Sequence, residues 1–175
     1  YLQLSYLGQL ANAQTYSYAF IRSGIPGVLL DREEKVNNLD IYVMSHCPYA
    51  IALENALIKL SNDINFDLNV HYVLQNEIDA EGNIKLKLES LNGEAEYNED
   101  IRQLVIQKYY PDKFLAYLER RNQDITSEDW QAVAQSVDID INDVQKKVES
   151  EGEGLLKDDA QAALDLGINS SPAYL

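Results

Sequence analysis

The single cysteine of this chain, Cys47, lies between a predicted strand and a predicted helix. The run from Leu39 to Met44 is mostly apolar and has the length of one buried strand. Pro48 follows the cysteine and suits the first position of a helix, where its missing N–H costs nothing. Residues 50–60 then carry apolar side chains at helical spacing. The chain is therefore predicted to place its one thiol at the N-terminus of a helix.

Alternating apolar residues predict further strands. Ile64 to Leu74 has apolar side chains at every second position over most of its length, and Ile84 to Leu88 alternates again. The turn at Gly82 separates the two runs, which indicates a hairpin or a strand with an extension. Residues 168–175 predict a last strand. The order strand, helix, strand at the start of this region favours a mixed sheet in an α/β domain.

The segment between these strands is predicted to be helical. The helical pattern starts at Asn98 and is interrupted at Pro111, which can begin the next helix. A long helical stretch follows over residues 140–163, and Gly152 and Gly154 predict a bend or a break within it.

Residues 1–38 form a separate, unassigned segment. Residues 2–14 have helical spacing, and short strands are predicted at residues 16–21 and 28–30 around a Gly/Pro turn. The polar connector at residues 31–38 marks a domain boundary, after which residues 39–175 form the main domain.

Composition limits the classes of function. Acidic residues outnumber basic ones by 29 to 14, and the resulting net charge of −15 opposes binding to nucleic acid. No window is apolar for 18 residues, so no membrane span is expected. The first residues carry no basic region, and no signal peptide is expected in this sequence. With one cysteine, the chain cannot form an internal disulfide.

The run Cys47-Pro48-Tyr49, the helical block and the pair Ser171-Pro172 together resemble the DsbA-like proteins of the thioredoxin superfamily. The resemblance extends from about Leu39 to Leu175 and includes the segment 101–114. It implies an α/β thioredoxin-like fold with a central mixed sheet and an α-helical insertion at about residues 95–165. The sequence stops soon after Pro172, short of the last elements of that fold. Either it is truncated, or residues 1–38 supply those elements.

The same resemblance assigns the candidate catalytic residues. The family uses a Cys-x-x-Cys motif whose first cysteine is the nucleophile, and Cys47 matches it, but Ala50 stands in the second place. Helix N-terminal N–H groups and the helix dipole favour a thiolate at Cys47, and a protonated His46 would add to this effect. Pro48 and Tyr49 complete the candidate catalytic set.

A cis-proline and an extended peptide substrate are also implied by the resemblance. Pro172 matches the cis-proline beside the active site, and the backbone of Ser171 would pair with the substrate. The expected partners are protein or peptide thiols and disulfides, with glutathione as a further candidate. Family analogy also implies a location outside the cytoplasm, periplasmic or secreted.

Three hypotheses follow from Ala50, because a mixed disulfide on Cys47 could be resolved only by an outside thiol. The chain is a monothiol enzyme, or a non-catalytic binding, assembly or chaperone module, or an engineered trap. Some similar proteins carry extra cysteines in the insertion, where this chain has Val105, Arg121 and Val133. That wider absence of cysteine favours natural loss over one engineered change.

No metal or cofactor is expected. Asp138, Asp140, Asn142 and Glu149 are spaced like a calcium-binding loop, but Asp143 occupies the position that requires glycine. Helix capping by Asp140 or Asn142 explains the same residues. Two histidines and one cysteine do not form a spaced zinc set.

Overall fold

The computed structural model describes residues 37–175. The helix predicted at residues 2–14 and the strands predicted at 16–21 and 28–30 lie outside this part of the chain. None of the helices in the described part is long and apolar enough to cross a membrane.

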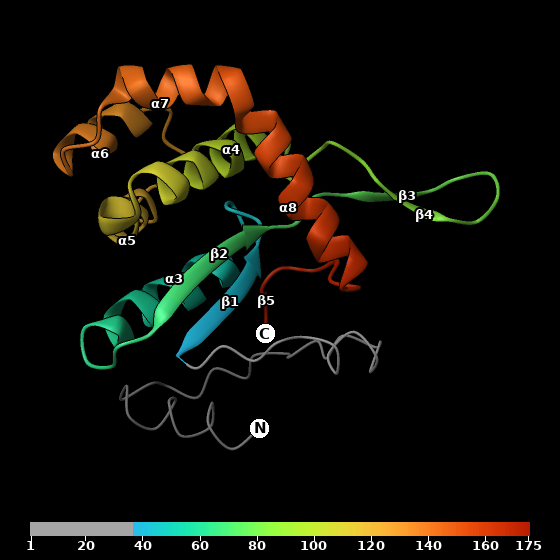
Figure 1. Ribbon diagram of the computed structural model, residues 1–175, viewed down its shortest axis with the longest axis horizontal. Helices are drawn as coiled ribbons and strands as arrows, with labels where there is room; N and C mark the ends of the chain where they lie inside the picture. The colour runs from blue at the N-terminus through green and yellow to red at the C-terminus, as the bar shows by residue number, and fades with distance from the viewer. Residues whose placement is uncertain (1–36) are drawn as a thin grey trace.

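A mixed three-stranded sheet forms the centre of the fold (Figure 1). Strand β1 (Asn38–Val43) pairs in parallel with β2 (Asp67–Tyr72) on one side and antiparallel with β5 (Ala173–Tyr174) on the other. Helix α3 (Pro48–Ser61) connects β1 to β2, so the predicted strand–helix–strand unit is present. The expected mixed sheet in an α/β domain is therefore confirmed.

Strand β2 is shorter than the alternating pattern predicted. The N–H of Ile64 donates to the carbonyl of Leu60 at 2.9 Å, so Ile64 still belongs to the hydrogen-bonded end of α3. Its side chain is exposed, and the ladder with β1 begins only at Asp67. An alternating pattern reports side-chain spacing and does not distinguish a strand from the turn that enters it.

The outer edge of β2 is closed by side chains from the helices that follow. The side-chain amide of Gln107 binds Val70 as the backbone of a neighbouring strand would. Its Oε1 accepts the N–H of Val70 and its Nε2 donates to the carbonyl of Val70, both at 2.9 Å. Asp159 accepts the N–H of Tyr72 at 2.7 Å. These bonds satisfy backbone groups that an edge strand would otherwise expose.

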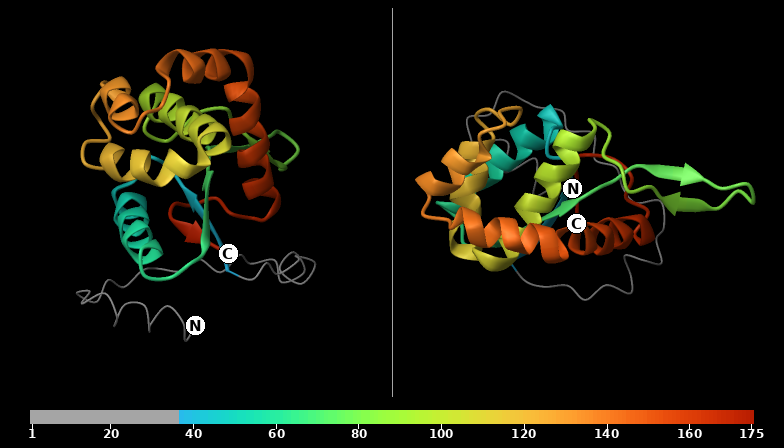
Figure 2. Two further views of the ribbon diagram at one scale, coloured as in Figure 1. Left: turned by 60° about the vertical axis from the view of Figure 1, so that its left-hand side comes forward. Right: turned by 90° about the horizontal axis from the view of Figure 1, so that it is seen from above.

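A second, two-stranded sheet projects from the body as a hairpin (Figures 1 and 2). It consists of β3 (Asn76–Ile78) and β4 (Ile84–Leu86), paired antiparallel. The predicted strand at 84–88 thus ends at Leu86, and it pairs with β3 rather than with β2. The hairpin forms between two short runs because the turn at residues 79–83 brings them together, and neither run joins the main sheet.

The helical block runs from Glu94 to Asp165. Its elements are α4 (Glu94–Tyr109), α5 (Pro111–Arg121), α6 (Trp130–Ser136), α7 (Ile141–Lys147), a π-helical turn (Val148–Gly152) and α8 (Glu153–Asp165). Asp140 caps α7 by accepting the N–H groups of Asn142 and Asp143, which accounts for the spaced polar residues there.

The two faces of β1 enter two apolar clusters. Ile41 and Val43 join a cluster with Leu57 of α3, whereas Tyr42 and Met44 join one with Ala163 of α8. Figure 2 shows α3 and α8 on opposite sides of the sheet. This layering leaves the end of β1 between the two helices, and Cys47 lies at that end.

Candidate functional site

Cys47 is the N-cap residue of α3. Its N–H donates to the carbonyl of Met44 at 2.9 Å, and its carbonyl accepts the N–H of Ile51 at 3.0 Å. Pro48 is the first residue of the helix, as predicted from its missing N–H. The half-buried thiol therefore lies on a tight turn between β1 and the N-terminus of α3.

The structure brings Ser171 and Pro172 to this cysteine from the far end of the chain. The thiol of Cys47 donates to the carbonyl of Ser171, with 3.6 Å between sulfur and oxygen. The hydroxyl of Ser171 accepts the N–H of Met44 at 2.8 Å. The Ser171–Pro172 peptide bond is cis. Two segments more than 120 residues apart in sequence thus meet at one thiol.

The residues after the cysteine face different surroundings. Ala50 is fully buried in the main apolar cluster, so the place of a second sulfur is closed and apolar. Tyr49 is 71% exposed and Pro48 is also exposed. Tyr49 therefore presents an aromatic ring to solvent two residues from the thiol.

His46 is held by its backbone rather than by its ring. Its N–H donates to Glu96 Oε1 at 3.0 Å, while its ring Nε2 is buried without a hydrogen-bond partner among the described residues. Burial lowers the pKa of His46, although the nearby charges of Glu96 and Glu99 oppose this shift. Burial therefore favours the neutral imidazole over the protonated form considered from the sequence.

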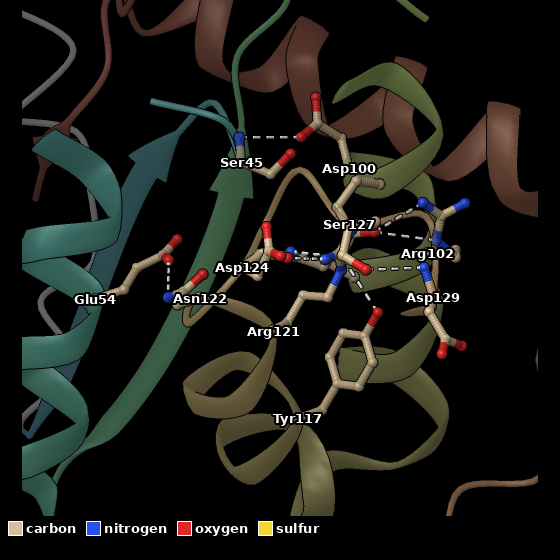
Figure 3. Close-up of polar contacts among 12 residues, drawn as sticks. Ser45, Glu54, Asp100, Arg102, Tyr117, Arg121, Asn122, Asp124, Ser127 and Asp129 are labelled. Carbon is tan, nitrogen blue, oxygen red and sulfur yellow. Dashed lines mark hydrogen bonds and ion pairs between the residues drawn. The ribbon is translucent and has the colours of Figure 1, made fainter. Parts of the chain in front are cut away.

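Two buried carboxyl groups of α4 anchor the turn that carries Cys47. Glu96 accepts the N–H of His46. Asp100 Oδ1 accepts the N–H of Ser45 at 3.1 Å (Figure 3). Burial raises the pKa of Asp100 well above its usual range, against the hydrogen bonds from Ser45 and Ser90. These bonds fix the backbone immediately before the thiol.

Glu96 and Asp100 were not predicted from the sequence, because acidic residues on a helix usually face solvent. One signal was present. The two residues are four apart, so they share a helix face, and Gln103 and Leu104 continue that face into the core.

Glu99 is the centre of a buried charged cluster with Arg102, Arg121 and Tyr117. Figure 3 labels these three partners. Its carboxylate lies 2.7 Å from Arg102 Nη2 and 3.2 Å from Arg121 Nε, and Tyr117 donates to it at 3.2 Å. Burial alone would raise the pKa of Glu99, but the two guanidinium groups outweigh it and the pKa is lowered. The carboxylate is therefore ionised, and it ties α4 to α5.

Glu54 is a buried acid on α3, the helix that begins at Cys47. Asn122 Nδ2 donates to its Oε2 at 2.7 Å, and its other oxygen has no partner among the described residues (Figure 3). Burial raises the pKa of Glu54 to about 8, more than the bond from Asn122 lowers it. Glu54 is thus mostly protonated at neutral pH.

In residues 37–175, no group of three or more His, Cys, Asp or Glu side chains is placed to hold a metal ion.

Comparison of the chain with known proteins identifies its fold. No family model matches the chain, and no curated protein matches it. Among solved structures, it is similar to the thiol-disulfide exchange protein alpha-DsbA2 of Wolbachia pipientis, at 13% identity over 82% of this chain and 72% of that one, with a TM-score of 0.55. It is also similar to Proteus mirabilis ScsC in a compact conformation, at 21% identity over 79% of this chain and 69% of that one, with a TM-score of 0.54.

These likenesses show that the chain has the thioredoxin-like fold with helices inserted, as in DsbA-like proteins. The fold class predicted from Cys47, the helical block and Ser171-Pro172 is confirmed.

Proposed function

We propose that this chain is a thiol–disulfide exchange protein that uses one sulfur, Cys47, and takes its second thiol from solution. The observation that carries this proposal is the meeting of Cys47 with the carbonyl of Ser171, 3.6 Å away in the cis-proline loop. Ala50 supplies no second sulfur. The name of the Wolbachia neighbour, a thiol-disulfide exchange protein, supports the same chemistry.

The proposed reaction is a pair of exchanges. The Cys47 thiolate attacks one sulfur of a substrate disulfide, a new S–S bond forms on Cys47, and the other sulfur leaves as a thiolate that takes a proton from water. An external thiolate then attacks the mixed disulfide and releases Cys47 with its electron pair. Each step breaks one S–S bond and forms another, so no further oxidant is required.

The proposed substrate is a protein or peptide disulfide that lies along the backbone of Ser171, next to the exposed ring of Tyr49. Glutathione or a protein cysteine is the external thiol. A compartment outside the cytoplasm belongs to the same proposal, because disulfide substrates persist there.

The test is to incubate the protein with a disulfide-linked peptide and to measure the mass of the intact protein over time. The wild-type chain is expected to gain one peptide on Cys47, and a low-molecular-weight thiol should remove it. Cys47→Ser should gain none. Ala50→Cys should release the peptide without added thiol, because the introduced sulfur would attack the mixed disulfide. That variant would then hold an internal disulfide and be lighter by two hydrogens.

A folded wild-type protein that forms no adduct, and reacts only when unfolded, would overturn the exchange reaction. The non-catalytic binding module would then be the better account of the fold.

A further inference from the structure

We propose that residues 75–93, the hairpin with the loop that follows it, form an arm that docks the polypeptide substrate of Cys47. This inference rests on the proposed function and adds to it a surface outside the cis-proline loop. The arm includes β3 and β4 and ends where α4 begins.

The first step is the connection between the arm and the cysteine turn. The carboxylate of Glu96 accepts the backbone N–H of Asn92 at 2.9 Å and the backbone N–H of His46 at 3.0 Å. The carboxyl group of Asp100 accepts the hydroxyl of Ser90 at 3.0 Å and the N–H of Ser45 at 3.1 Å. The base of the arm and the turn before Cys47 are therefore held by the same two side chains.

The second step is the order within the arm. Asp79 organises the hairpin turn by accepting the N–H of Asn83 at 2.7 Å and the N–H of Glu81 at 3.1 Å. Gly82 has a φ of 86°, a conformation that glycine adopts without strain. At the base, Gln75 exchanges backbone hydrogen bonds with residues 87 and 89. These hydrogen bonds order the arm, although a hairpin on its own is only marginally stable in water.

The third step is what the arm exposes. Ile78, Ile84 and Leu91 are 74%, 60% and 65% exposed, and Leu88 is also exposed. Ile78 and Ile84 are direct cross-strand partners, so they lie side by side. Four of the seven large apolar side chains exposed in residues 37–175 belong to the arm. Such clustering marks an interaction surface, whereas single exposed apolar residues do not.

A cleft of about 480 Å³ lies between the arm and α8. Its apolar lining comes from Ile84, Leu86 and Leu88 on the arm and from Leu164 on α8. Polar side chains complete the lining: Lys85, Lys157 and Gln161. Helix α8 ends at Asp165, and the chain that follows it leads to Ser171 at the thiol.

The exposed apolar side chains of the arm favour a polypeptide over glutathione as the occupant. The two lysines of the arm are already paired, Lys85 with Asp79 at 2.9 Å and Lys87 with Glu89 at 2.6 Å. The arm therefore offers paired cations and exposed apolar side chains, whereas glutathione is a small anion. We commit to an extended, apolar polypeptide segment next to the substrate disulfide.

The experiment compares two disulfides on each protein variant: a disulfide-linked peptide with apolar flanks, and glutathione disulfide. The measured quantity is the ratio of the two rate constants for adduct formation on Cys47. In Leu91→Ser and in Ile84→Ser, this ratio should fall by up to roughly tenfold per side chain, the loss expected for one buried apolar contact. Ile64→Ser is the matched control, because Ile64 is also exposed but lies at the end of α3, and its ratio should stay within about twofold of wild type.

An unchanged ratio in both arm variants, or an equal fall in Ile64→Ser, would overturn the docking arm and leave the exchange reaction standing. A wild-type protein that reacts with neither disulfide would overturn the proposed function itself, and the arm with it.

Discussion

Four carboxyl groups of α3 and α4 are buried, and their surroundings stabilise them in different ways. Glu99 is ionised beside Arg102 and Arg121. Asp100 and Glu96 accept backbone N–H groups of the cysteine turn. Glu54 has one amide donor and one oxygen without a partner among the described residues, so burial favours its neutral form. An isolated buried carboxylate is costly, and protonation is the usual way to avoid that cost.

Glu54→Gln is expected to stabilise the protein at alkaline pH and to have little effect under acidic conditions. The pKa of Glu54 is about 8 in the folded state, against a reference value of 4.5. Its contribution to the free energy of unfolding is therefore fully present below pH 4.5. That stability is lost as pH rises to 8, by about 1.4 kcal/mol per pH unit at most. Glutamine stays neutral and can keep the bond from Asn122.

Urea unfolding of both proteins between pH 4.5 and 8.5 measures this effect. Glu119→Gln, an exposed position on α5, is the control and should follow wild type. Parallel stability curves for wild type and Glu54→Gln would show that Glu54 is not buried as described.

The bend between α7 and α8 requires a residue without a side chain at Gly152. Gly152 lies in the π-helical turn, and a Cβ built on it would clash with Cγ2 of the buried Ile101 on α4. Its φ of −59° is ordinary, so close packing rather than backbone conformation requires glycine here. Gly154, two residues on, has nothing within 4 Å of such a Cβ.

Gly152→Ala should therefore lower the free energy of unfolding by about 1–3 kcal/mol, the usual cost of overpacking a core. Gly154→Ala is the matched variant and should be neutral or raise it by up to about 1 kcal/mol, because alanine is the better helix former. Denaturant unfolding at one pH compares the two variants. Equal effects would mean that the π-helical turn is not packed against Ile101 as the structure has it.

The whole molecule carries a net charge of −15, spread along the chain. A field of one sign concentrates oppositely charged reactants and repels those of like charge, and salt screens both effects. If Cys47 exchanges disulfides, the charge of the substrate should therefore control the rate at low ionic strength.

We expect cystamine, a cationic disulfide, to react more slowly as sodium chloride is added, and anionic glutathione disulfide to react faster. The ratio of the two rates should shift by roughly tenfold or more between low and high salt. Hydroxyethyl disulfide is neutral and should show little change. Rates that do not respond to salt for any of the three would contradict steering by the molecular field.

Local patterns predicted the elements around the thiol because their information is contained in neighbouring residues. The apolar run before Cys47, Pro48 at the helix start and the apolar spacing after it predicted β1 and α3. The same reasoning predicted too long a strand at Ile64, where the chain is still bonded to the end of α3. Alternation also predicted a strand at Ile84, but not that this strand would leave the main sheet.

By itself, the sequence determined the fold class, the position of the only thiol at a helix start, and the absence of a second sulfur at Ala50. Only the tertiary structure decided that Ser171 reaches Cys47, that Glu96 and Asp100 hold the turn before it, and that the same two side chains bind Ser90 and Asn92. The physical reason is the separation in sequence between the residues that interact. Helix and strand preferences depend on residues a few positions apart, whereas the contacts of Ser45, His46 and Cys47 join segments at least 50 residues apart.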